Sequence, residues 1–134
     1  MAALTIHHVG IAVGDLDEAI ATYAALFGAT LEHRETVPDQ GVEAASLQVG
    51  GSRIELLRPL GPDTPVGKFL AKRGPGLHHV AFAVPDVAAE LERLKADGTE
   101  LIDETPRIGL FGHQVAFVHP EATGGVLAEF VADG

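Results

Sequence analysis

The chain carries one sequence motif twice, and this repeat limits the possible folds more than any other feature. Residues 6–15 read Ile-His-His-Val-Gly-Ile-Ala-Val-Gly-Asp, and residues 77–86 read Leu-His-His-Val-Ala-Phe-Ala-Val-Pro-Asp. The second histidines of the two doublets, His8 and His79, are 79 − 8 = 71 residues apart. A repeat of this kind predicts two copies of one structural unit. The length of 134 residues suits a single domain that contains both copies.

Each copy predicts the same order of elements. The stretch after each doublet has the alternation of a strand, and Asp15 or Asp86 can then cap a helix, which Gly28 or Gly98 ends. Further strands are predicted over residues 42–49, 52–57, 114–119 and 126–131. We therefore predict an α+β fold of two tandem βαβββ modules, residues 5–60 and 76–132.

The connector over residues 61–75 predicts a short helix. Thr64 can cap it, Pro65 suits its first turn, and Gly74 suits its end. The connector also carries several basic residues, so we expect it to contribute to the rim of the site.

Two glutamates repeat together with the histidines. Ile54-Glu-Leu-Leu57 corresponds to Ala128-Glu-Phe-Val131, so the glutamates are 129 − 55 = 74 residues apart. Because side chains alternate across a strand, His7 and His78 share a face with the large apolar residues, whereas His8 and His79 face small ones. The second histidine of each doublet is therefore the candidate ligand.

Two imidazoles and two carboxylates form a suitable ligand set for one divalent cation such as Co, Mn, Ni, Fe or Zn. The predicted metal ligands are His8, Glu55, His79 and Glu129. A single histidine or glutamate of this kind is more often a structural or solvent-facing residue. The recurrence of both residue types at equivalent positions favours the metal site.

Composition excludes several other kinds of site. The chain has no cysteine, so it has neither zinc–thiolate sites nor thiol nucleophiles. A net charge of -10 argues against nucleic acid or an anionic membrane as a partner. We find neither a leader nor an apolar run of about 18 residues, which together with the lack of cysteine leads us to expect a cytoplasmic protein.

The repeated motifs resemble the vicinal oxygen chelate, or glyoxalase-like, superfamily. Within it the chain most closely resembles the methylmalonyl-CoA epimerases, over nearly its whole length. The most particular matches are Pro65-Val-Gly-Lys-Phe-Leu-Ala-Lys and Gly76-Leu-His-His-Val-Ala-Phe. The four metal ligands of these epimerases align with the four residues predicted above. The resemblance also implies a curved mixed β-sheet around a metal-binding cleft, and a homodimer.

The resemblance implies inversion of methylmalonyl-CoA, or of a close 2-substituted malonyl-CoA, between its 2R and 2S forms. A base removes the α-proton, a divalent ion stabilises the enolate oxygen, and an acid returns a proton to the opposite face. Glu129 matches one of the two proton-transfer groups of the family. Candidate contacts to the acyl-CoA are Lys68, Lys72, Arg73, Arg107 and His113.

The second proton-transfer group is where the chain departs from the family. Several members have a glutamate two residues after the valine of Gln40-Gly-Val42, and here that position is Ala44. The nearest acid is Glu43, which a regular strand would direct to the other face. We predict that Glu43 is catalytic if a bulge or a shifted register turns it inward. A water or His113 is the alternative.

Two other functions suit the same scaffold. One is a different glyoxalase-like metalloenzyme, of the lactoylglutathione lyase or dioxygenase type. The other is a protein that binds a small ligand without metal catalysis. The complete set of two histidines and two glutamates argues against a pure binding protein, which needs no such centre.

Overall fold

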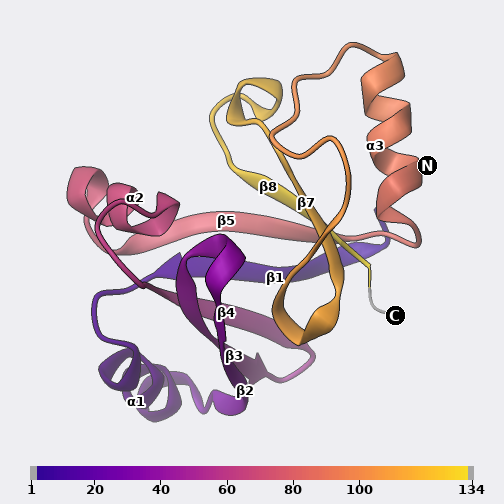
Figure 1. Cartoon of the computed structure of the whole chain (residues 1–134). Coiled ribbons are helices and arrows are strands. Elements are labelled where there is room, and N and C mark those ends of the chain that lie inside the picture. The colour runs from indigo at the N-terminus through magenta and orange to yellow at the C-terminus, as the bar shows by residue number, and fades with distance from the viewer. Residues whose placement is uncertain (1–2, 133–134) are drawn as a thin grey trace. The chain divides into compact units, whose positions relative to one another are not determined.

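The computed structural model describes residues 3–132, and the chain divides into two compact units (Figure 1). The first unit comprises residues 8–78, and the second comprises residues 79–132 together with the described start of the chain, 3–7. Each boundary falls between the two histidines of a doublet and not at the predicted connector. Within the second unit, the Leu4 N–H donates to the carbonyl of Ala83 at 2.8 Å and so connects the start of the chain to β5.

The first unit contains one copy of the repeat and the connecting helix. Its strands form a sheet in the order β2-β3-β4-β1, in which β1 and β4 are parallel and the other pairs are antiparallel. Its elements are β1 (Thr5–Ala12, whose first residues belong to the second unit), α1 (Leu16–Phe27), β2 (Thr30–Val37), η1 (Pro38–Gln40), β3 (Val42–Val49), β4 (Ser52–Pro59) and α2 (Pro65–Arg73).

The second unit repeats this plan with the strand order β5-β8-β7-β6, in which β5 and β8 are parallel. The predicted α+β class and the two βαβββ modules with mixed strand pairing are confirmed. The last strand begins two residues later than predicted. The elements are β5 (Gly76–Ala83), α3 (Val87–Ala96), β6 (Arg107–Ile108), η2 (Leu110–Gly112), β7 (Gln114–Val118), η3 (Pro120–Thr123) and β8 (Ala128–Ala132).

The predicted caps set the ends of the helices. Asp15 Oδ1 accepts from the N–H of Glu18 at 3.0 Å, and Asp86 Oδ1 accepts from the N–H of Ala89 at 3.1 Å. Gly28 ends α1 with a φ of 68°, a conformation that glycine adopts without steric cost. Within residues 3–132, the helices are too short or too polar to cross a membrane.

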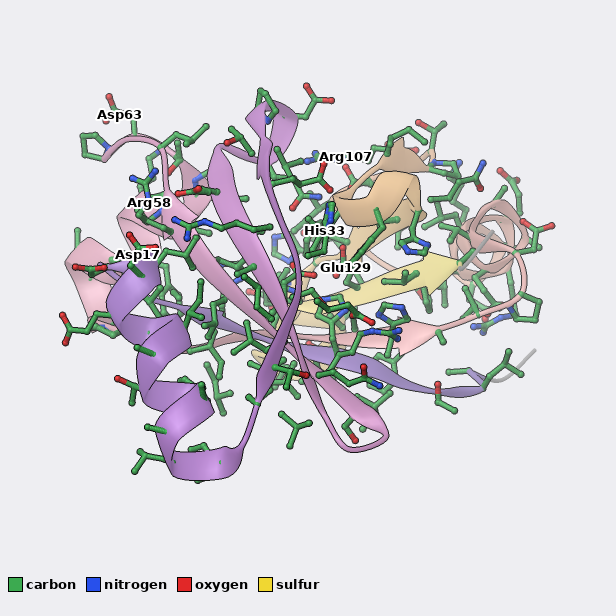
Figure 2. All side chains as sticks on the ribbon, turned by 90° about the horizontal axis from the view of Figure 1, so that it is seen from below. Asp17, His33, Arg58, Asp63, Arg107 and Glu129 are labelled. Carbon is green, nitrogen blue, oxygen red and sulfur yellow. The ribbon has the colours of Figure 1, made fainter. Side chains whose placement is uncertain are left out.

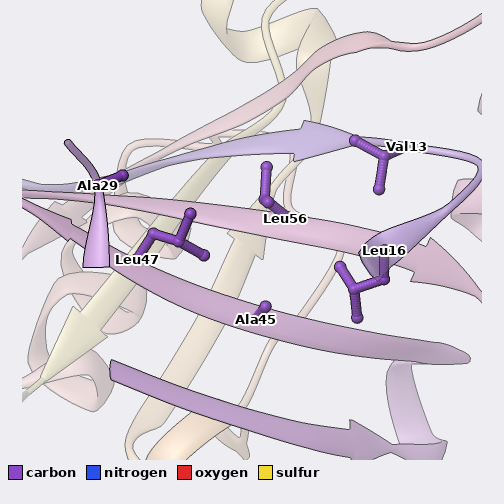
Figure 3. Close-up of a cluster of buried hydrophobic side chains, with 6 residues drawn as sticks. All are labelled: Val13, Leu16, Ala29, Ala45, Leu47 and Leu56. Atoms are coloured by element: carbon purple, nitrogen blue, oxygen red, sulfur yellow. The ribbon is translucent and has the colours of Figure 1, made fainter. Parts of the chain in front are cut away.

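The core of the first unit lies between α1 and one face of its sheet (Figure 3). Leu16 of α1 packs with Ala45 and Leu47 of β3 and with Leu56 of β4. Because side chains alternate along a strand, the intervening residues of β3 and β4 point to the opposite face. We call this opposite side the His8 face, and it carries His8, Ala44, Ser46 and Glu55. In the second unit, Val84, Val87, Leu91 and Ala116 form the corresponding cluster.

Candidate metal centre

Neighbouring parallel strands of the first unit bring His8 and Glu55 together. β1 and β4 pair with Gly10 opposite Glu55, so His8 lies diagonally across from the glutamate on the same face. His8 Nε2 lies 3.4 Å from Glu55 Oε2. Both residues are buried, with exposures of 5% and 8%. The first unit therefore contains one nitrogen donor and one oxygen donor that face each other and are largely shielded from bulk water.

The second unit contains the same pair at the equivalent positions. β5 and β8 pair with Ala81 opposite Glu129. His79 Nε2 lies 3.3 Å from Glu129 Oε1, and both residues are buried. The ring of Phe117, which lies opposite Glu129 on β7, contacts the His79 ring edge-on at 5.7 Å between centroids. This aromatic contact packs one side of the imidazole.

The chemistry of these two pairs fits a divalent metal. A buried carboxylate is costly unless a cation or hydrogen-bond donor compensates its charge. An imidazole nitrogen and a carboxylate oxygen are ligand types that several first-row divalent ions accept. Neither pair includes sulfur, since the chain has no cysteine. Each pair has one nitrogen donor and one oxygen donor, the ligand types predicted from the sequence.

The first histidine of each doublet contacts aromatic rings. The ring of His7 lies 5.9 Å from that of His113 and the ring of His78 lies 5.0 Å from that of Phe69, both edge-on. His113 also contacts the ring of Phe111 at 5.6 Å. These packing contacts agree with the sequence-based choice of His8 and His79 as the candidate ligands.

Glu43 lies on the wrong face for the catalytic role considered from the sequence. The register between β3 and β4 is continuous from Val42 to Val49, so no bulge turns Glu43 towards the His8 face. Its carboxylate accepts from Arg34 Nε at 3.0 Å and from Arg58 Nη2 at 3.1 Å. Arg34 also bonds Asp17 of α1 at 2.6 Å. In Figure 2, Asp17 and Arg58 lie on the α1 side of this sheet, whereas His33 lies away from them.

We expect the Glu43→Gln substitution to lower stability and to leave turnover close to the wild-type value. Hydrogen bonds from Arg34 and Arg58 hold the pKa of the Glu43 carboxyl below its ordinary value. A lowered pKa contributes stability above the pKa of the unfolded chain, and this contribution is lost as the pH falls towards the folded-state pKa. Urea unfolding at several pH values should therefore show a deficit at neutral pH that disappears in acid. A large loss of turnover in this variant would restore Glu43 to the mechanism.

The predicted acyl-CoA contacts divide between the two units. Lys68, Lys72 and Arg73 are exposed on α2, and the Arg73 guanidinium lies over the Phe69 ring at 5.8 Å. In the second unit, Arg107 is half-buried and its Nη1 lies 3.5 Å from Asp103 Oδ1. The lysines are one helical turn apart, which suits contacts to neighbouring phosphates.

The structure adds two residues that the sequence did not single out, His33 and Glu35 of β2. They lie across from Ser46 and Ala44 and hence on the His8 face of the first unit. In the sequence these are two polar residues, two positions apart. Only the pairing of β2 with β3 assigns them to a face of the sheet.

The sequence model of the Glyoxalase/Bleomycin resistance protein/Dioxygenase superfamily matches residues 7–117. The chain belongs to this superfamily.

Within the superfamily, several of the similar proteins are named as epimerases. The ethylmalonyl-CoA/methylmalonyl-CoA epimerase of Cereibacter sphaeroides is 38% identical, over 92% of this chain and 94% of the relative. The crystal structure of methylmalonyl-CoA epimerase from Mycobacterium tuberculosis is 42% identical, with a TM-score of 0.95 over 98% of this chain and 89% of that one. A methylmalonyl-CoA epimerase in complex with methylmalonyl-CoA and NH4+ is 37% identical, with a TM-score of 0.95 over 99% and 96% of the two chains. These relatives confirm the predicted resemblance.

Proposed function

We propose that this chain is a methylmalonyl-CoA epimerase that inverts the carbon between the carboxylate and the thioester carbonyl. The observation that carries the proposal is the pair of buried His–Glu contacts at equivalent positions of the two copies. It is supported by similar proteins named as epimerases of methylmalonyl-CoA, and one of them also as an epimerase of ethylmalonyl-CoA. Substrates of this class share an α-carbon that carries a proton and lies between two carbonyl carbons.

We further propose that His8, Glu55, His79 and Glu129 together hold one divalent ion. The candidate group His8, His79 and Glu129 is entirely buried and has the ligand types that such ions accept. When bound, the ion would supply Lewis acidity towards an enolate oxygen. Its identity among Co, Mn, Ni, Fe and Zn stays open, because one donor set accepts several of these ions.

The residues of the chain itself bind the substrate and move its proton. Glu129 is proposed to exchange a proton with the α-carbon on one face, since a buried carboxylate can act as a general base. Lys68, Lys72, Arg73 and Arg107 are proposed to bind the phosphates of the CoA portion, with His113 as a further substrate contact. The homodimer and the cytoplasmic location implied earlier remain predictions.

Incubation of one epimer of methylmalonyl-CoA in D2O tests the reaction directly. We expect the protein loaded with each candidate metal in turn to incorporate deuterium at the α-carbon and to produce the opposite epimer. Mass spectrometry measures the label, and chromatography of the intact thioester separates the epimers. Protein treated with a chelator serves as the control. Absence of both exchange and inversion with every metal would overturn the proposed function.

The same preparation distinguishes the alternative enzyme class. A lactoylglutathione lyase would act on the adduct of glutathione with methylglyoxal and would leave the α-proton of an acyl-CoA in place. Activity on that adduct, in the absence of acyl-CoA exchange, would favour the lyase.

A further inference from the structure

Positive charge that is not neutralised by an ion pair gathers on one helix, α2. The chain has nine lysines and arginines against 19 aspartates and glutamates. Carboxylates pair with six of the basic residues, which are Arg34, Arg53, Arg58, Arg93, Lys95 and Arg107. The other three are Lys68, Lys72 and Arg73 of α2, and within residues 3–132 none of them has a carboxylate partner. In an otherwise acidic chain, α2 is therefore the element suited to an anion.

The three cations share one face of α2 with an aromatic ring. Lys68 and Lys72 are four residues apart, as are Phe69 and Arg73, so two neighbouring rows of side chains run along the helix. Val66, on the opposite face, is buried with an exposure of 3%. Both lysines and Arg73 are exposed, and Phe69 is half-buried. One ligand can therefore contact the two rows together.

Arg73 and Phe69 form a flat surface beside the lysines. The Arg73 guanidinium lies over the Phe69 ring, 5.8 Å from its centroid. A planar guanidinium that packs on a ring with one side leaves its other side for a second flat group. Purine bases stack on arginine side chains in this way. The Phe69 ring in turn packs edge-on against His78 at 5.0 Å, which supports the pair from the start of β5.

Close packing holds the first turn of α2 in place. Thr64 Oγ1 accepts from the N–H of Gly67 at 3.1 Å, and the same hydroxyl donates to the carbonyl of Gly61 at 2.8 Å. A methyl group on Gly67 would overlap that carbonyl oxygen, so the helix backbone lies directly against the preceding loop. Thr64 also leaves no room for a side chain at Gly41. The helix is thus ordered before a ligand arrives, which lowers the entropic cost of binding.

We propose that this face of α2 binds the adenosine 3′,5′-bisphosphate end of an acyl-CoA, with the two lysines on phosphates and Arg73 stacked on the adenine. The inference rests on the proposed epimerase function, and it assigns Arg73 to the base as well as to the phosphates. Lysine ammonium groups bind phosphate through charge-assisted hydrogen bonds. The consequence is specificity: the protein distinguishes CoA thioesters from thioesters of phosphopantetheine, which lack the nucleotide.

Kinetics with a complete and a truncated substrate test the assignment. Methylmalonyl-CoA and methylmalonyl-pantetheine have the same reacting carbon, but the second has no nucleotide. We expect Lys68→Gln and Lys72→Gln each to raise the KM for methylmalonyl-CoA about tenfold or more, with kcat and the KM for methylmalonyl-pantetheine unchanged. Arg73→Lys keeps the charge but loses the planar group, and should raise the KM for methylmalonyl-CoA about fivefold or more.

Lys95→Gln is the matched control, because it removes a lysine of α3 that pairs with Glu92. It should have the wild-type KM for both substrates. The midpoint of thermal unfolding is measured for every variant, since cations in the last turn of α2 also stabilise the helix dipole.

Binding of the nucleotide alone gives a readout that needs no reaction. Isothermal titration calorimetry with adenosine 3′,5′-bisphosphate should show binding to the wild-type protein, weakened about tenfold or more by Lys68→Gln or Lys72→Gln. Adenosine, which has no phosphate, should bind far more weakly than the bisphosphate.

The outcomes separate this inference from the proposed function. A wild-type KM for methylmalonyl-CoA in both lysine variants would overturn the nucleotide site and leave the epimerase proposal standing, even if the unfolding midpoint fell. An equal rise in KM for both substrates would also overturn it, because the lysines would then act on the part that the substrates share. A wild-type protein that binds the bisphosphate but neither exchanges nor inverts methylmalonyl-CoA would overturn the proposed function and leave α2 as a nucleotide site.

Discussion

Replacing His79 with Ala is expected to remove the bound metal and to reduce inversion of methylmalonyl-CoA about 1,000-fold or more. His79 supplies a buried nitrogen donor 3.3 Å from Glu129, and no other histidine of the described residues has the equivalent position in the second copy. A Lewis acid contributes several kcal/mol to a reaction of this type, and about 1.4 kcal/mol corresponds to a tenfold change in rate. Elemental analysis of the purified variant measures the metal, and the D2O assay measures the reaction.

The matched control is His78→Ala, which alters the neighbouring histidine of the doublet. His78 packs against Phe69, so this variant should lose some stability and keep its metal. Comparison of His8→Ala with His79→Ala then tests whether both copies hold one shared ion. Each should lose the whole of a single equivalent. If the wild-type protein instead bound two ions per chain and either variant kept one of them, each His–Glu pair would bind its own ion.

The Leu56→Ala substitution is expected to have the largest effect on stability, lowering the free energy of unfolding by about 2–5 kcal/mol. Leu56 is fully buried on β4 and packs in the cluster formed with α1 (Figure 3). Truncation to Ala removes apolar contacts and leaves a cavity that the surrounding strands fill only in part. Urea unfolding followed by circular dichroism measures the change.

Leu26→Ala provides the comparison for Leu56→Ala, because Leu26 is 68% exposed on α1 and loses little burial when truncated. Ala is also a better helix former than Leu, which offsets part of any loss. A Leu56→Ala variant no less stable than Leu26→Ala would contradict the assignment of Leu56 to the core.

The sequence predicted the features that depend on local chemistry. Asp15 and Asp86 were expected as caps because a carboxylate before an apolar helix accepts from free backbone N–H groups, and both accept from the residue three positions on. The contact of His8 with Glu55, and of His79 with Glu129, followed the alternation of strands that begin with the same doublet. A repeat makes such a prediction stronger, since each copy checks the other.

The features that escaped prediction depend on contacts between strands. Whether Glu43 or Glu35 shares a face with Glu55 is decided by the register of three strands, and a shift of one residue would exchange the two faces. The irregularity near His33 has no clear signature in the amino-acid pattern. His33 was accordingly not singled out from the sequence, whereas it contacts Glu35 on the His8 face.

The hydrogen bond from Leu4 to Ala83 limits where the chain can be divided into two fragments. The opening residues of the first copy are part of the compact unit formed by the second copy. A chain cut in the connector would therefore leave the carboxyl-terminal fragment with an unpaired strand edge, which favours aggregation. We therefore expect the two fragments to be less soluble when expressed separately than the whole chain. A circular permutant that keeps residues 3–7 joined to residues 79–132 would keep the second compact unit in one continuous segment.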